Sequence, residues 1–213
     1  GKTFLELTDG DKKKQIAFAE KKGIDCFQIT ANLKDTISDL SFLDTKKTKG
    51  IFIQFENLKN NSDLNRFKNL DTLVAGYLSY PNSIIDFENL LNIKILKINW
   101  NKNFINIDKL DKIIRLTLWK FQPKSRTLLD LLNFKQLVYV TLTMATIDSL
   151  NGIENIQTLK ELDLRNIKTL KFFFTDQTKS NLQLEKLNIS CCKNLNLDTL
   201  PHMDSLKILN LNQ

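Results

Sequence analysis

Residues 137–158 read LVYVTLTMATIDSLNGIENIQT, and this stretch decides the fold. It opens with Leu137, Val140 and Leu142 in the pattern L-x-x-L-x-L, in which x is any residue. The alternation at the end of this pattern is that of a strand with one buried face. The apolar residues that follow are three positions apart, a spacing that suits 3₁₀ turns or short helices. The stretch therefore predicts one strand followed by a short return segment.

The same pattern recurs about every 22 residues from Ile24 onward, and a fixed spacing of this kind is the signature of a repeat protein. Every apolar slot except the one at Thr48 holds an apolar residue, although only 42% of the chain is hydrophobic. One repeat cannot bury its own apolar side, so neighbouring repeats must stack. The nine copies start at Ile24, Thr48, Leu70, Ile93, Ile113, Leu137, Leu159, Leu184 and Leu206.

Stacked repeats predict an α/β repeat solenoid in the form of a horseshoe. About nine parallel strands would form its concave face, with short 3₁₀, helical or extended returns on its convex face. Residues 24–213 would make up this solenoid, within a single domain overall. Residues 1–23 are expected to form an N-terminal cap, because Thr3–Thr8 alternates like a strand and Asp11–Lys22 reads as a helix that ends at Gly23.

The repeat is similar to the leucine-rich repeat, and its length resembles that of bacterial proteins of the internalin type. Residues 137–158 match best, and the resemblance covers residues 24–213. One departure concerns the position three residues after the last strand slot, where the family places an asparagine whose amide bonds the neighbouring turn. The chain has Asn32, Glu56, Leu78, Asn101, Phe121, Ala145, Ile167 and Cys192 there. Most of the amide ladder is therefore absent. The resemblance implies a leucine-rich repeat horseshoe and a role in binding.

The sequence shows no pattern typical of catalysis, a cofactor or a metal. The single histidine, His202, has no evident nucleophile beside it, and no glycine-rich phosphate loop or zinc-binding motif occurs. Cys26, Cys191 and Cys192 form no disulfide framework. No apolar run approaches the length of a transmembrane helix. We expect a chain that is not an enzyme and carries no cofactor.

The register of the repeats also predicts which side chains line the concave face. They are the x positions of the motif and the two residues beyond its last slot, and in copies two to six they are rich in aromatic and basic residues. Trp, Tyr and Arg are the types enriched at interface hot spots. The formal net charge of +7 favours an acidic partner. The predicted partner-binding residues are Phe52, Phe55, Tyr77, Lys94, Lys97, Trp100, Arg115, Trp119, Lys120, Tyr139 and Met144.

These features favour a protein-interaction module, used either as an inhibitor or immunity protein or as an adhesin. The alternative is single-stranded nucleic-acid or glycan binding on the same aromatic and basic face. The few cysteines favour the cytoplasm, whereas a signal peptide removed before Gly1 would indicate a secreted or cell-surface protein. We expect a monomer, with pairing through the edge strand at residues 206–212 as the alternative.

Overall fold

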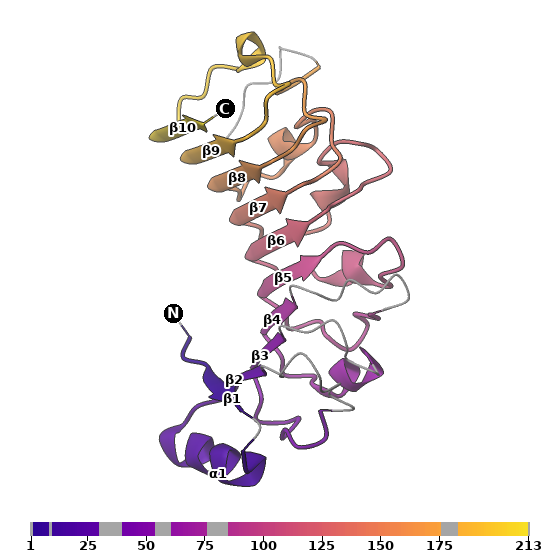
Figure 1. Cartoon of the computed structure of the whole chain (residues 1–213). Coiled ribbons are helices and arrows are strands. Elements are labelled where there is room, and N and C mark those ends of the chain that lie inside the picture. The colour runs from indigo at the N-terminus through magenta and orange to yellow at the C-terminus, as the bar shows by residue number, and fades with distance from the viewer. Residues whose placement is uncertain are drawn as a thin grey trace. The chain divides into compact units, whose positions relative to one another are not determined.

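A computed structural model describes residues 2–8, 10–29, 40–53, 61–75, 85–175 and 183–212. The predicted residues Phe55 and Tyr77 lie outside these ranges, as do Asn32, Glu56 and Leu78. The chain consists of two compact units, Gly1–Leu110 and Asp111–Gln213. Each unit contains its own run of parallel strands, joined by return segments that carry 3₁₀ turns (Figure 1).

The first unit begins with a strand and a helix and continues with four repeats. Each strand pairs in parallel with the next one along the chain. The elements are β1 (Leu5–Leu7), α1 (Lys12–Lys22), β2 (Cys26–Ile29), β3 (Gly50–Ile53), the 3₁₀ helix η1 (Asn61–Arg66), β4 (Thr72–Ala75), β5 (Ile95–Asn99) and the 3₁₀ helix η2 (Ile107–Lys109).

The helix α1 has capping residues at both ends, as its sequence predicts. The Asp11 carboxylate accepts a hydrogen bond from the backbone N–H of Lys14 at 3.2 Å. Gly23 ends the helix in the left-handed conformation at φ 66°, and its N–H donates to the carbonyls of Ala19 and Glu20. The strand and the helix expected in the first 23 residues are therefore both present.

The second unit has the same organisation without a long helix. Its strands also pair in parallel in the order of the chain. The elements are β6 (Arg115–Trp119), η3 (Leu129–Leu131), β7 (Tyr139–Thr143), η4 (Ile153–Asn155), β8 (Glu161–Arg165), β9 (Lys186–Ser190), η5 (Leu197–Thr199) and β10 (Ile208–Asn212). Within the described residues, no helix is long and apolar enough to cross a bilayer.

The inward slots of the repeats form the core of each unit. In copies two to eight every slot is buried, and even Thr48 is only 1% exposed. The ninth copy differs, because Leu209 and Leu211 on β10 are both 40% exposed. Parallel strands, buried slots and short 3₁₀ returns define a leucine-rich repeat solenoid, which is the fold that the sequence predicts.

A row of four residues at the end of the strands connects the repeats of the second unit. Lys120, Met144, Asn166 and Cys191, called here the edge row, all adopt the left-handed conformation, with φ between 53° and 56°. Each backbone N–H donates to the carbonyl of the last residue of the next strand, at 2.7–2.9 Å. The next position holds the buried side chains of Phe121, Ala145, Ile167 and Cys192. Main-chain hydrogen bonds therefore link the repeats at the ends of these strands.

Candidate protein-binding faces

The strands of each unit have an outward side, here called the open face, opposite the buried slots. In the second unit it begins with alternate residues of β6 and β7, which lie directly opposite one another. Arg115 is in register with Tyr139, Thr117 with Thr141, and Trp119 with Thr143. Because side chains directly opposite in a parallel sheet lie about 5 Å apart, these residues form one continuous surface.

The most distinctive part of this face is a set of five aromatic, basic and apolar residues at the two ends of β6 and β7, called here the aromatic corner. It consists of Arg115, Trp119, Lys120, Tyr139 and Met144. The Arg115 guanidinium lies 4.0 Å from the centroid of the Tyr139 ring, which is a cation–π contact. Trp119 and Tyr139 are half-buried, whereas Met144 is 48% exposed. Arg115 and Lys120 form no ion pair with any described residue. The corner therefore offers apolar area and positive charge on β6 and β7 and directly beyond their ends.

The strands β8 and β9 carry charges that neutralise one another. The Arg165 guanidinium donates two hydrogen bonds to the Asp163 carboxylate, at 2.9 and 2.5 Å. Glu185 lies 2.7 Å from the Lys207 amine and 3.3 Å from the Lys160 amine. The hydrogen bonds from these two lysines lower the pKa of Glu185. These charged side chains of β8, β9 and their flanking residues are therefore paired with one another.

The open face of the first unit places its predicted residues differently. Phe52 lies in the middle of β3 and is half-buried, as is Lys97 on β5, while Lys94 is exposed. The Trp100 ring packs edge-to-face on Phe104, with centroids 6.0 Å apart. Phe104 makes the same kind of contact with the fully buried Phe87 at 5.6 Å. The Trp100 ring therefore packs on the return segment, although Trp100 directly follows β5, a strand of the open face.

Charges alternate in sign at the start of the strands in the first unit. Asp25, Lys49, Asp71 and Lys94 occupy the second position of successive repeats. The Lys49 amine lies 3.4 Å from the Asp25 carboxylate, and Lys2 forms an ion pair with Asp71. The positive charge predicted for this region is therefore partly neutralised by residues of the same face.

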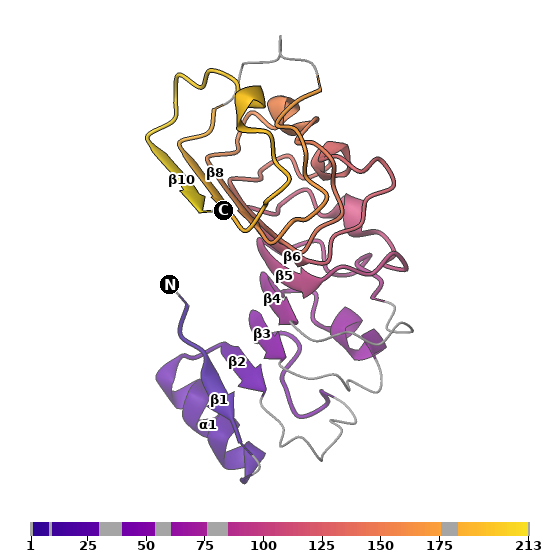
Figure 2. The same ribbon diagram turned by 45° about the horizontal axis from the view of Figure 1, so that its top comes forward.

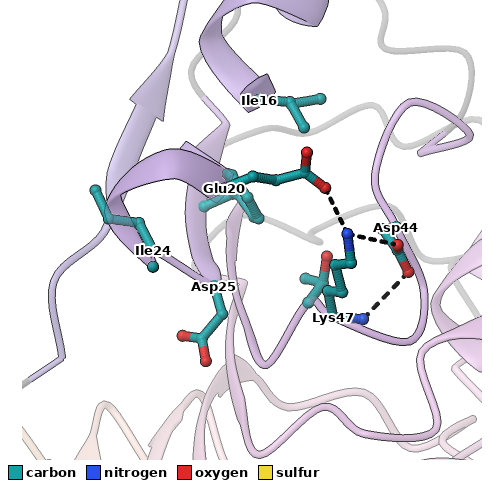
Figure 3. A pocket seen from close by; sticks show the side chains of 9 residues that line it. Ile16, Glu20, Ile24, Asp25, Asp44 and Lys47 are labelled. Atoms are coloured by element: carbon teal, nitrogen blue, oxygen red, sulfur yellow. Dashed lines mark hydrogen bonds and ion pairs between the residues drawn. The ribbon is translucent and has the colours of Figure 1, made fainter. Parts of the chain in front are cut away.

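A cavity of about 250 Å³ lies between α1 and the segment that leads to β3 (Figure 3). Its apolar lining includes Ile16 and Phe27, and Lys47 stands at its rim, 2.8 Å from Glu20 and 3.8 Å from Asp44. Backbone N–H donors lower the pKa of Asp44, and the hydrogen bond to Glu20 raises the pKa of Lys47. The Lys47–Glu20 ion pair joins the helix to the first repeat.

The chemistry of the remaining candidate groups is limited. His202 is exposed and lies 2.7 Å from Asp204, which is equally exposed. Cys26 and Cys192 are buried, and burial raises the pKa of Cys26 to about 12 and also raises that of Cys192. Among the described residues, no three His, Cys, Asp or Glu side chains gather as they would around a metal ion. The open faces are the features best suited to a function.

The comparisons with known proteins return leucine-rich repeat structures. The chain is similar to an internalin of Listeria monocytogenes, with 16% identity, a TM-score of 0.49 and coverage of 87% of this chain and 60% of that chain. It is also similar to internalin C2 of the same organism, with 14% identity, a TM-score of 0.43 and coverage of 88% and 69%. Both are internalins, the class that the repeat sequence resembles. No protein-family model and no curated protein sequence matches the chain.

Proposed function

We propose that the chain is a non-enzymatic protein-interaction module that binds an acidic partner protein through its open faces. The observation that carries the proposal is the aromatic corner of the second unit. Trp119 and Tyr139 are half-buried on paired strands, and aromatic side chains lose little conformational entropy when a partner covers them, because they have only two rotatable bonds. Arg115 and Lys120 add positive charge beside them, which favours and steers an acidic surface.

The first unit carries further predicted contacts, although Phe4 already packs on one of them, Phe52. Phe52, Lys94, Lys97 and Trp100 belong to its open face or border it. Trp100 also packs on Phe104, so its truncation would disturb the fold as well as a binding surface. The second unit is therefore the better place for a test. An inhibitor or immunity protein and an adhesin are the two uses that such a face would serve.

At Tyr139, the cation–π contact weighs against the alternative of nucleic-acid or glycan binding. A base or a sugar would stack on the face of an aromatic ring. The Arg115 guanidinium already covers one face of the Tyr139 ring at 4.0 Å. A partner protein can instead use the guanidinium, the ring edge and Met144 together. Salt dependence separates nucleic-acid binding from protein binding, because phosphate contacts give a steep loss of affinity with salt.

The test combines partner capture with point variants of the purified chain. Partners captured from native extracts are identified, and their affinities for the chain are then measured by calorimetry. Trp119→Ala and Tyr139→Ala should each weaken binding by about 2 kcal/mol, or roughly 30-fold, as expected of hot-spot residues. Phe172→Ala is the matched control, because Phe172 is 40% exposed in the second unit but lies on a return segment. Equal affinities for all three variants would refute the proposal.

A further inference from the structure

Residues 2–4, called here the N-terminal segment, reach across the open face of the first unit. The segment precedes β1 and belongs to no strand (Figure 2). Lys2 forms an ion pair with Asp71, which lies 69 positions further along the chain and directly precedes β4. Phe4 packs edge-to-face on Phe52 of β3, with ring centroids 6.5 Å apart and an interplanar angle of 75°. The segment thus contacts two different repeats through its side chains.

A glycine beneath Phe4 makes room for this contact. A Cβ atom added to Gly50 would lie 3.3 Å from the Phe4 ring and 2.5 Å from the Cys26 sulfur. Any larger residue at position 50 would therefore overlap the Cys26 side chain and press against the Phe4 ring. Gly50, Phe52 and Asp71 all lie against the side chains of the N-terminal segment, and these three residues are called here the recess.

We propose that this recess is a docking site for an extended peptide segment with a lysine two residues before a phenylalanine, and that the N-terminal segment is its internal occupant. This inference rests on the proposed function, in which the open faces bind proteins. A partner that presents the same pair of side chains must displace Lys2 and Phe4. The recess selects a cation through Asp71 and a flat ring through Phe52 and Gly50, so its partner segment differs in charge from the acidic surface expected at the aromatic corner.

The strength of the two contacts suits an occupant that can be displaced. The side chains of Lys2 and Asp71 are 34% and 24% exposed, so solvent screens their ion pair. An ion pair of this kind together with an edge-to-face aromatic pair gives roughly a 3- to 70-fold preference for the closed state. The apparent affinity of a competing peptide falls by the same factor, because only the open fraction of the protein can bind it.

The experiment uses the peptide acetyl-Gly-Lys-Thr-Phe-amide as the probe, titrated into the full ¹⁵N-labelled chain and followed by NMR. The variant Lys2→Ala/Phe4→Ala, which empties the recess, should show saturable shifts at Gly50, Phe52 and Asp71. The unaltered chain should need roughly 10 times more peptide for the same shifts.

A matched control removes the same two residue types from the surface of α1. Lys13→Ala/Phe18→Ala should behave like the unaltered chain, since Phe18 is 51% exposed and lies on α1, which contains no recess residue. Adding Phe52→Ala to the emptied variant should abolish the shifts. Equal peptide affinity with and without Lys2 and Phe4, no binding by the emptied variant, or binding that survives Phe52→Ala would each overturn the inference. None of these results depends on Trp119, so the test of the proposed function stands separately.

Discussion

Gly152 offers a sharp test of how the return segments of the second unit pack. It adopts a left-handed conformation with φ 103°, at the start of η4. A Cβ atom at this position would lie 2.7 Å from the Leu129 nitrogen and 2.9 Å from the Leu128 carbonyl carbon. Both contacts are with backbone atoms, which cannot rotate away. Gly152→Ala therefore combines conformational strain with a steric overlap between neighbouring repeats.

The size of the effect follows from these two components. A residue with a side chain in a sparsely populated conformation costs about 1–3 kcal/mol, and forcing atoms into a packed region costs about 1–3 kcal/mol more. Gly152→Ala should therefore destabilise its unit by about 4 kcal/mol. Gly23→Ala is the matched comparison, because Gly23 also has a positive φ, 66°, but no atom within 4 Å of the added Cβ. It should cost only about 1–2 kcal/mol.

The two variants are compared by hydrogen exchange of the most protected amides, read in the unit that contains each glycine. This assay reports the free energy of opening for each unit by itself. If Gly152→Ala costs no more than Gly23→Ala, the backbone overlap is not a feature of the folded protein. Thermal unfolding should agree, with a shift of about 8–16 °C for Gly152→Ala against about 2–8 °C for Gly23→Ala.

Three further outcomes are expected. Leu162→Ala should cost about 2–5 kcal/mol in urea unfolding, whereas Leu209→Ala, at a slot that is 40% exposed, should cost less than about 1 kcal/mol. A thiol reagent at about pH 8 should modify the exposed Cys191 but leave Cys26, whose pKa is raised to about 12 by burial, unmodified until the unit unfolds. The pKa of Asp148 is lowered because an arginine side chain donates hydrogen bonds to its carboxylate. The contribution of Asp148 to stability is therefore present above about pH 4, and it is lost as the pH falls through the folded-state pKa. Unfolding curves of Asp148→Asn should therefore change less between neutral and acidic pH than those of the unaltered chain.

The strands and the core were predictable because the repeat pattern reports burial directly. Leu162 and Leu164 are separated by one outward residue, and this alternation is enough to place both in the core. The strand and helix at the N-terminus were predictable from local signals, such as the Asp11 cap and the Gly23 terminus. Such signals lie within a few residues of the structure that they determine.

Contacts between distant residues could not be predicted in this way. The ion pair of Lys2 with Asp71 joins residues 69 positions apart, and no periodic pattern relates them. The packing of Trp100 on Phe104 arises because the chain folds back after β5, which the strand pattern alone does not describe. The eleven predicted binding residues remain a prediction, and of these Phe55 and Tyr77 lie outside the described residues.

The edge row of the second unit has a consequence for how this scaffold can change. Its linking hydrogen bonds come from the main chain, and four chemically unlike residues, Lys120, Met144, Asn166 and Cys191, occupy equivalent places. The link between repeats therefore does not depend on which of these side chains occupies a given place in the row. Because the row borders the open face, its members can be exchanged to alter recognition while the architecture is kept. The same four positions are natural sites for a library that seeks new binding specificities.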